Sequence, residues 1–336
     1  MRKIISVVLV LTLLRAFAPA VFAAEAYDSF GAYEHVFIIG VDGLGASLEK
    51  VDSPNFDRIF AADNAYRHDA VTEYVTVSAQ NWGSILTGVP YDVHGFDNGW
   101  CEKNERGSDS DNHSIFYYAR RAFPDAELVS FNNWSAINHG IIENDLNVKK
   151  INRGTDPLVV DAILDYFEQG NVPKLMFVQL DSVDHAAHTY GGFSKQYYKA
   201  AKKADIYLGD IYDAIEERGL MKDSLFILVA DHGETDGGHG GQTKEESSAV
   251  LAIAGHSVNQ TELNENVHNR DVAAIALYAL GIEQPEQFVA SVPEELFGES
   301  RDKTTDKNPM SSIQRALRKF VYFFVRLIDK IAALFD

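Results

Sequence analysis

Five apolar, β-branched runs constrain the fold of this chain more than any other feature of its sequence. They lie at residues 35–41, 126–131, 174–180, 225–230 and 249–254. Helical patterns lie between them: Asp156-Pro157 begins one helix that ends before Gly170, and residues 194–218 have the pattern of a longer helix. Strands that alternate with helices predict an α/β protein, here a three-layer α/β/α sandwich around a mostly parallel central sheet.

Three of these runs end at or next to an aspartate. Asp42 follows the first run, Asp181 and Asp184 follow the third, and Asp231 follows the fourth. Ligands of open parallel sheets bind at the carboxyl ends of the strands, so these carboxylates should face one crevice. Carboxylates that crowd together repel one another and need cations. Glycines in the segment FIIGVDGLG would let the backbone turn tightly behind Asp42.

The chain contains a single cysteine, Cys101, and carries a formal net charge of -19. An intramolecular disulfide is therefore excluded, and so is a zinc site built from several cysteines. Any bound metal must be held by histidine and carboxylate side chains. Because nucleic-acid backbones are bound by clusters of Lys and Arg, so acidic a chain is a poor nucleic-acid binder.

The N-terminal residues 1–24 have a basic start, an apolar run at 4–14 and small residues at 20–24. This layout predicts a secretory signal peptide, cleaved after Ala23 or Ala24. It also predicts an extracytoplasmic location in a bacterium, either secreted or associated with the cell envelope. An uncleaved membrane anchor is the alternative, although the apolar run is shorter than the ~20 residues of a spanning helix.

The rest of the chain divides into three predicted parts. Residues 25–297 form one large domain, residues 298–310 a polar linker, and residues 311–336 an amphipathic helix. One face of this helix is basic and the other is rich in Phe. Two interpretations stay open: contact with an anionic membrane surface, or docking on the domain or on a second subunit.

Four short segments carry side chains that can bind metal, although no segment is decisive alone. They are FIIGVDGLG, TVSAQNWGSILTGVPYDVHGFDN, LDSVDHAAHTYGG and ADHGETDGGHGGQT. Together they supply aspartate, serine and histidine side chains. Such a set of oxygen and nitrogen donors can hold two divalent ions.

In order and spacing these segments resemble the alkaline phosphatase superfamily, and within it the nucleotide pyrophosphatase/phosphodiesterase branch. In that branch a Thr or Ser nucleophile is followed by Asn three positions on, then by Thr-Gly and later by His-Gly. The matching residues here are Ser78, Asn81, Thr87-Gly88 and His94-Gly95. Thr76 is a rival nucleophile, but Ala79 stands three positions after it. The spacing therefore favours Ser78.

The resemblance implies an alkaline phosphatase-like domain with two divalent ions, for which zinc is the expected metal. It implies that the first ion is held by Asp42, Ser78, Asp231 and His232. The second ion would take an Asp and a His four residues apart plus one more His, which we assign to Asp184, His188 and His239. Asp181 with His185 is the alternative register, because Ala187 replaces the glycine of the branch pattern D-x-x-G-H-x-Y-G.

The mechanism implied by the resemblance is hydrolysis of a small phosphorylated substrate through a covalent phosphoryl-Ser78 intermediate. Ser78 would attack phosphorus, and the second ion would stabilise the leaving oxygen. Residues 80–86 are predicted to open a helix, so that its first amides and the Asn81 side chain would face the non-bridging oxygens of the substrate.

The segment AQNWGS lacks the arginine with which secreted alkaline phosphatases hold a monoester. Its absence favours phosphodiester or pyrophosphate bonds, unless Arg120, Arg121 or Arg153 supplies that charge. The alternatives are a phosphomonoesterase, a phosphoryl transferase acting on envelope polymers, and a non-catalytic metal- or phosphate-binding surface protein. Sulfatase chemistry is disfavoured, because Ser78 lacks the C/S-x-P-x-R context that sulfatases of this fold require.

Overall fold

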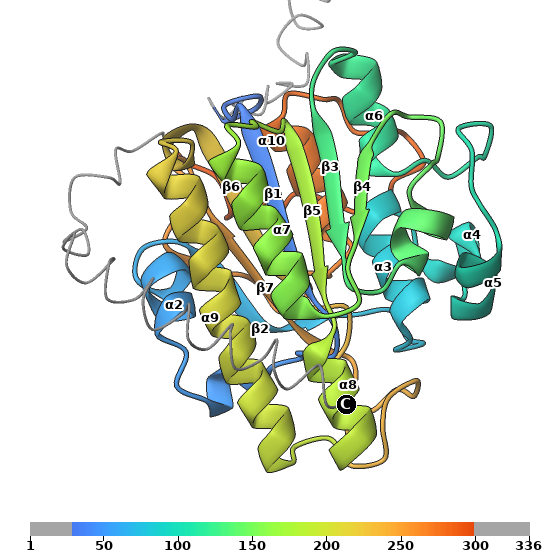
Figure 1. Cartoon of the computed structure of the whole chain (residues 1–336), viewed down its shortest axis with the longest axis vertical. Coiled ribbons are helices and arrows are strands. Elements are labelled where there is room, and N and C mark those ends of the chain that lie inside the picture. The colour runs from blue at the N-terminus through green and yellow to red at the C-terminus, as the bar shows by residue number, and fades with distance from the viewer. Residues whose placement is uncertain (1–28, 299–336) are drawn as a thin grey trace, which may run out of the picture.

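The computed structural model describes residues 29–298, which form an eight-stranded sheet with helices on both faces (Figure 1). The strand order is β4-β3-β5-β1-β6-β7-β2-β8. Neighbouring strands are parallel except at β7, which is antiparallel to both β6 and β2. The predicted fold class is confirmed. The strands are β1 (His35–Val41), β2 (Ala65–Val71), β3 (Leu128–Asn132), β4 (Lys149–Asn152), β5 (Leu175–Leu180), β6 (Ser224–Val229), β7 (Ser248–Ala254) and β8 (Thr261–Glu262).

The five predicted strands correspond to β1, β3, β5, β6 and β7. Strands β2, β4 and β8 were not predicted, because they lack an apolar run. In β2, three consecutive polar residues precede Ala70, and the pairing with β7 shifts register between Arg67 and Ala70. Strands β4 and β8 are short and lie at the two edges of the sheet. An edge strand has a partner on only one side and tolerates polar side chains.

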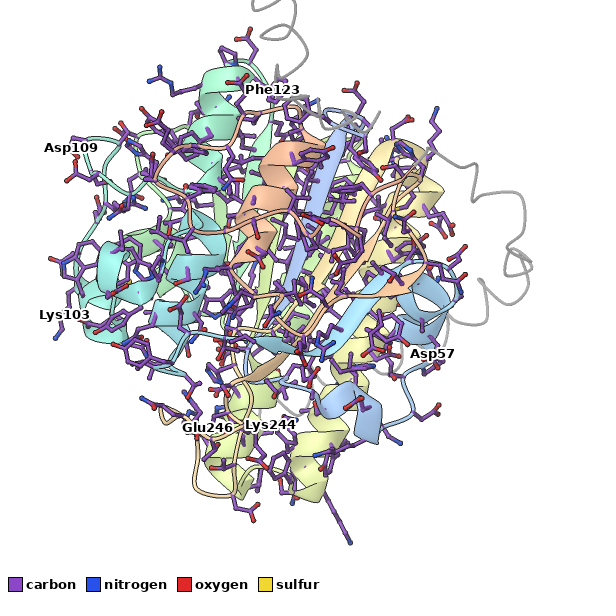
Figure 2. The ribbon with its side chains drawn as sticks, turned by 180° about the vertical axis from the view of Figure 1, so that it is seen from behind. Asp57, Lys103, Asp109, Phe123, Lys244 and Glu246 are labelled. Atoms are coloured by element: carbon purple, nitrogen blue, oxygen red, sulfur yellow. The ribbon has the colours of Figure 1, made fainter. Side chains whose placement is uncertain are left out.

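Helices form a layer on each side of the sheet. Helices α7 and α9 cover the face toward the viewer in Figure 1, and α3, α6 and α10 cover the face seen from behind in Figure 2. The helices are α2 (Pro54–Phe56), α3 (Ser78–Thr87), α4 (Tyr91–His94), α5 (Asn98–Lys103), α6 (Ile115–Ala122), α7 (Asp156–Glu168), α8 (Ser182–Tyr190), α9 (Lys195–Glu217) and α10 (Asp271–Ala279). Shorter 3-10 and π-helical turns lie at Ser47–Lys50, Asp57–Ala61, Ile137–Ile141 and Met221–Asp223.

The central strand β1 shows why the sheet needs both layers. Val36 and Ile38 pack into the hydrophobic core that includes α10, whereas Phe37 and Ile39 pack into the core that includes α9. All four side chains are completely buried. The sequence of a strand that is buried on both faces is continuously apolar, and this feature is the one from which β1 was predicted.

Two glycines allow the loops at the carboxyl ends of β1, β5 and β6 to meet. Gly43 and Gly45 both have positive φ angles, which glycine adopts without strain. A Cβ atom on Gly43 would lie 2.8 Å from the Cα of Asp184, and one on Gly45 would lie 2.7 Å from the Cα of Gly233. The tight turn predicted behind Asp42 therefore also makes room for two neighbouring loops.

The predicted signal peptide at 1–24, the linker beyond residue 298 and the amphipathic helix at 311–336 lie outside the described residues. Within residues 29–298, no helix is long and apolar enough to cross a membrane.

Candidate active site

Four buried side chains meet where β1 and β6 end and α3 begins. We call them the inner cluster: Asp42, Ser78, Asp231 and His232. Ser78 Oγ lies 3.5 Å from Asp42 Oδ1 and 3.4 Å from His232 Nε2. His232 Nε2 also lies 3.4 Å from Asp42 Oδ1 and 3.3 Å from Asp231 Oδ2. Such separations suit ligands that each stand about 2.0–2.2 Å from one ion.

Hydrogen bonds fix one side of each aspartate in the inner cluster. Asp42 Oδ2 accepts the indole N–H of Trp82 at 2.9 Å and the amide N–H of Gln179 at 3.0 Å. Asp231 Oδ1 accepts the backbone N–H groups of Gly43 at 3.1 Å and His232 at 2.9 Å. The other oxygen, Asp231 Oδ2, is buried without a hydrogen-bond partner. Burial and the neighbouring Asp42 raise the pKa of Asp231 well above its usual value.

The histidine of the inner cluster is oriented in the same way. The Nδ1 atom of His232 lies 3.1 Å from the carbonyl oxygen of Gly233, which can only accept, so Nδ1 carries the proton. The bare Nε2 atom then faces Asp42, Ser78 and Asp231 as a ligand atom. Metal-binding histidines in proteins are commonly held in this manner.

A second group, the outer cluster, consists of Asp184, His188 and His239. Asp184 and His188 lie one turn apart on α8, with His188 Nε2 3.4 Å from Asp184 Oδ2. His239 Nε2 lies 3.3 Å from Asp184 Oδ1 and 3.0 Å from His188 Nε2. The carbonyl oxygen of Thr76 accepts the His239 Nδ1 hydrogen at 2.6 Å and leaves Nε2 bare. Burial alone would raise the pKa of Asp184, but the neighbouring imidazole groups of His239 and His232 lower it to about 2.

The two clusters adjoin, because the rings of His232 and His239 stack with their centroids 3.9 Å apart. The two clusters differ in solvent exposure. The His188 side chain of the outer cluster is 55% exposed, whereas the His232 side chain of the inner cluster is completely buried. Asp184 Oδ1 and Asp231 Oδ2 are both buried without a hydrogen-bond partner. Unsatisfied carboxylate oxygens that face bare imidazole nitrogens fit divalent cations, so the residues present suit the two ions expected here.

The alternative pair for the outer cluster, Asp181 and His185, does not come together with His239 in the structure. Asp181 accepts a hydrogen bond at 3.0 Å from Gln179, the same amide that binds Asp42. Burial and the charge of Asp42 raise the pKa of Asp181 to about 8. His185 is exposed on the surface of α8. The structure thus brings Asp184 and His188 into the site and leaves His185 outside it.

Ser78 and Thr76 have different environments. Ser78 is the first residue of α3, and its Oγ points into the inner cluster. The Thr76 Oγ donates to the carbonyl oxygen of Gly241 at 3.1 Å and accepts from the N–H of Gly240 at 2.9 Å. Thr76 therefore fastens the loop that carries His239, and its hydroxyl is not available as a nucleophile.

Asn81 does not do what the sequence pattern suggested. Its side chain is completely buried, and its amide group donates to the carbonyl oxygens of Val75 at 3.1 Å and Val77 at 3.2 Å. Its Oδ1 accepts from the backbone N–H of Glu73 at 2.9 Å and from the Asn269 side chain at 3.2 Å. With its donors used inside the protein, Asn81 has none for a substrate oxygen. It positions the chain that leads into Ser78.

Sequence analysis missed two polar side chains of the site. Asn98, the first residue of α5, accepts the N–H of Ala79 at 2.9 Å and so lies beside the nucleophile. Glu234 is 1% exposed, and neither of its carboxylate oxygens has a hydrogen-bond partner among the described residues. Burial and the neighbouring Asp184 raise the pKa of Glu234 to about 10. The only available signal was its position within DHGE, two residues after His232.

Comparison with known families gives an extended match. The sequence profile of the family described as type I phosphodiesterase / nucleotide pyrophosphatase matches residues 36–315. Among characterised proteins, GPI ethanolamine phosphate transferase 1 of Emericella nidulans is 26% identical over 39% of this chain and 17% of its own length. The same transferase of Yarrowia lipolytica is 23% identical over 77% of this chain and 33% of its own length. The chain thus corresponds to a third or less of these relatives.

Solved structures share the fold at low sequence identity. Murine ectonucleotide pyrophosphatase / phosphodiesterase 5, solved as an inactive variant with AMP, superposes with a TM-score of 0.62 at 13% identity, over 75% of this chain and 96% of that one. The lipoteichoic acid synthase LtaP from Listeria monocytogenes gives a TM-score of 0.59 at 14% identity, over 79% and 76%. A 2-O GAG sulfatase gives 0.64 at 11% identity, over 81% and 76%. All three have the same α/β architecture.

Proposed function

The chain belongs to the type I phosphodiesterase / nucleotide pyrophosphatase family of the alkaline phosphatase superfamily, and we propose that it cleaves phosphate esters with Ser78 and two divalent ions. Phosphodiester or pyrophosphate bonds are the favoured substrates. The observation that carries the proposal is the convergence of the inner and outer clusters around one hydroxyl group. Bound divalent ions would lower the pKa of that hydroxyl and offset the charge on the phosphoryl oxygens.

In the proposed reaction Ser78 supplies the nucleophilic oxygen. Its Oγ loses a proton to solvent and forms a bond to phosphorus, while the bond from phosphorus to the leaving oxygen breaks. The leaving group takes up a proton from water. A water molecule then attacks the phosphoryl-Ser78 ester, the bond between Oγ and phosphorus breaks, and Ser78 regains its proton. Asp42 and His232 hold the hydroxyl in place through both steps.

Asn98 takes the role in substrate binding that sequence analysis gave to Asn81. Because Asn98 Oδ1 accepts the N–H of Ala79, its NH2 group lies beside Ser78 and is only half-buried. We propose that this group donates to a non-bridging oxygen of the substrate. The amides at the start of α3 add the partial positive charge of a helix N-terminus.

The preference for diesters gains support from two of the three arginines that could have held a monoester, Arg120 and Arg121. Arg120 donates to five backbone carbonyls, those of Phe123, Pro124, Ala126, Leu146 and Asn147. Arg121 donates to the Tyr117 hydroxyl on α6. Helix α6 lies toward the end of the sheet opposite α8 (Figure 1). Both guanidinium groups are thus engaged away from Ser78.

Transfer of a phosphoryl-containing group to an acceptor other than water is the second candidate. It is favoured by the characterised relatives, which are named as GPI ethanolamine phosphate transferases. The chemistry at Ser78 would be the same in its first step, and an alcohol would replace water in the second.

Purified protein loaded with Zn²⁺ should be assayed with bis-p-nitrophenyl phosphate, p-nitrophenyl phosphate and an aryl sulfate. We expect the diester to be turned over faster than the monoester, and the sulfate not at all. Added alcohol acceptors distinguish transfer from hydrolysis, because transfer from bis-p-nitrophenyl phosphate yields a new diester in place of p-nitrophenyl phosphate. Equal turnover of the diester by wild type and Ser78→Ala would reject Ser78 as the nucleophile.

A further inference from the structure

Glu234 is a buried carboxylate for which the inner and outer clusters give no role. It lies in the loop between β6 and β7 and is 1% exposed. Within residues 29–298, neither Oε1 nor Oε2 has a hydrogen-bond partner. Glu246, in the same loop, is the contrasting case: its oxygens accept from the N–H of Gly241 at 2.7 Å and from the N–H of Thr243 at 3.1 Å. A buried carboxylate without a donor is costly, so Glu234 requires another partner.

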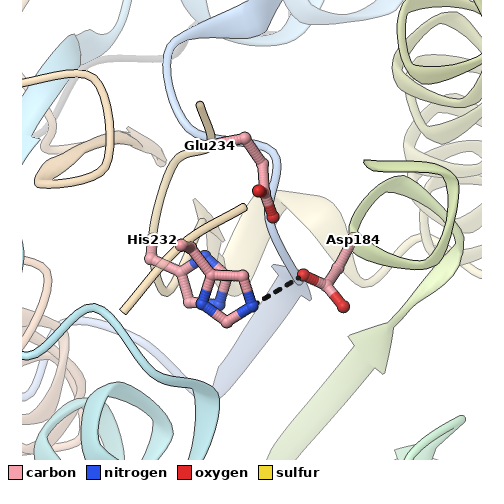
Figure 3. A group of neighbouring side chains, drawn as sticks. Asp184, His232 and Glu234 are labelled. Carbon is pink, nitrogen blue, oxygen red and sulfur yellow. Dashed lines mark ion pairs between the residues drawn. The ribbon is translucent and has the colours of Figure 1, made fainter. Parts of the chain in front are cut away.

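The surroundings of Glu234 consist of metal-binding groups. One donor atom each from Glu234, Asp184, His232 and His239 lie within 4.8 Å of one another. Figure 3 shows the side chains of Asp184, His232 and Glu234 pointing toward one another. The backbone leaves room on the remaining side, because a Cβ on Gly43 would lie 3.0 Å from Glu234 Oε1. The carboxylate therefore sits in a pocket of glycine backbone, aspartate and imidazole.

Asp184 and Glu234 face each other, and within the described part of the chain neither carboxylate has a lysine or arginine as ion-pair partner. The ion-pair partners of Asp184 among the described residues are the histidines of the outer cluster, and His239 already donates its Nδ1 hydrogen to Thr76. Like charges at such a separation destabilise the folded state unless a proton or a cation is shared. A divalent ion at this position would satisfy both carboxylates and the bare Nε2 atom of His239 at once.

We propose that Glu234 is a ligand of the outer ion, together with Asp184, His188 and His239. This inference rests on the proposed function, because it presumes that the outer cluster binds metal. Its donor set becomes two carboxylates and two imidazoles. The four carboxylates of the site, Asp42, Asp184, Asp231 and Glu234, then balance the charge of two divalent ions before substrate binds.

The test compares Glu234→Gln with the matched control Glu246→Gln in full-length protein. Metal is removed with a chelator, Zn²⁺ is added back in a calorimetric titration, and bound zinc is counted by mass spectrometry. For Glu234→Gln we expect the affinity of one of two sites to fall at least about tenfold, so that one ion per chain remains at limiting zinc. Glu246→Gln should keep both ions, because its carboxylate is fully hydrogen-bonded within the loop.

Thermal unfolding of the metal-free proteins gives a second readout that does not depend on activity. Glu234→Gln keeps the size of the side chain and should leave the unfolding temperature of the metal-free protein close to that of wild type, while the stabilisation by added zinc shrinks. Glu246→Gln loses satisfied hydrogen bonds and should lower it. If Glu234→Gln fails to fold, Glu234→Met keeps a similar volume and is expected to behave in the same way.

The outcomes separate the two proposals. Two zinc ions in wild type with unchanged affinities in Glu234→Gln would overturn the role of Glu234 and leave the proposed function standing. A wild-type protein that binds no divalent ion would overturn both. Loss of one ion in Glu234→Gln, with the control unchanged, supports Glu234 as a ligand.

Discussion

The inner and outer clusters differ in how the protein holds them. In the inner cluster, Asp42 and Asp231 follow buried strands, and backbone or core groups bind the oxygen of each that faces away from the site. In the outer cluster, His188 projects from α8 with its side chain 55% exposed, and His239 depends on a loop fastened by Thr76. The inner cluster is built where buried strands end and α3 begins, whereas the outer cluster is assembled from a helix and a loop.

This difference indicates in which cluster a metal ligand can be substituted with little effect on folding. A carboxylate ligand fixed by the scaffold, such as Asp42 or Asp231, is pre-organised, so losing it should disturb both metal binding and folding. A ligand on an exposed helix surface should affect metal binding with little effect on folding. The predictions below test this contrast, beginning with the largest expected effect.

The strongest test of the inner cluster is Ser78→Ala. If Ser78 is the nucleophile, kcat/KM for a diester should fall by at least about a thousandfold, as for removal of other catalytic nucleophiles. The remaining ligands Asp42, Asp231 and His232 stay in place, so bound metal should change little. Steady-state kinetics and metal analysis of the same sample measure both. A fall in activity that is explained by loss of both ions would contradict the assignment.

For the outer cluster, His188→Ala can be compared with His185→Ala, a neighbouring exposed histidine on α8. Loss of His188 should weaken the outer ion about 10–100-fold, and the unfolding temperature of the metal-free protein should barely change, because the side chain is largely exposed. His185→Ala should match wild type in zinc titrations. The reverse ranking of the two variants would favour the register with Asp181 and His185.

Asn81→Ala tests the hydrogen bonds that position the chain leading into Ser78. It leaves the buried backbone N–H of Glu73 unpaired, removes one of the two hydrogen bonds that the Asn269 amide group donates, and should lower the free energy of unfolding by about 2 kcal/mol. Asn98→Ala, which is half-buried, should instead lower kcat/KM with little change in denaturant midpoint. A stable Asn81→Ala protein with weakened substrate binding would restore Asn81 as a substrate-binding residue.

We expect His94, which contacts the helix that carries Ser78, to make the stability of the protein depend on pH. Its Nδ1 accepts from the N–H of Phe96 at 3.0 Å, and its Nε2 lies 3.1 Å from the carbonyl oxygen of Gln80 and 3.0 Å from Ser84 Oγ. Burial lowers the pKa of His94 to about 4, so the folded protein keeps it neutral while the unfolded chain takes up a proton near its ordinary pKa of 6.5.

The sign follows from proton uptake by the unfolded state. Between pH 6.5 and about 4 the unfolded chain binds more protons at this site, so stability falls as the pH is lowered, by up to about 1.4 kcal/mol per unit. Denaturant unfolding of wild type and His94→Gln at several pH values measures this slope. We expect the variant to have the flatter slope, and identical slopes would show that His94 titrates alike in both states.

The inner cluster could be predicted from sequence more fully than the outer one, for a physical reason. Asp42 and Asp231 follow continuous apolar runs, and the parallel sheet brings the ends of those runs together. The same reasoning could not choose between Asp184 and Asp181, because both follow one strand and their direction depends on where α8 begins. The structure settles which of them faces His239.

The two differences have a common cause, since both concern the burial and hydrogen bonding of a polar side chain. Asn81 occupies a motif position that suggested contact with substrate, but its partner Asn269 lies 188 residues away. Glu234 looks like an ordinary loop residue in the sequence, and only its burial without a donor marks it as unusual. Neither the burial nor the pairing of a polar side chain can be read from local spacing.

The central claim is that two divalent ions lie side by side at Ser78. Anomalous diffraction from zinc-loaded crystals at the zinc absorption edge tests it most directly. The account predicts two peaks about 3.5–4 Å apart, one among the inner-cluster residues and one among the outer-cluster residues with Glu234 in contact. A single peak, or peaks away from these side chains, would contradict it.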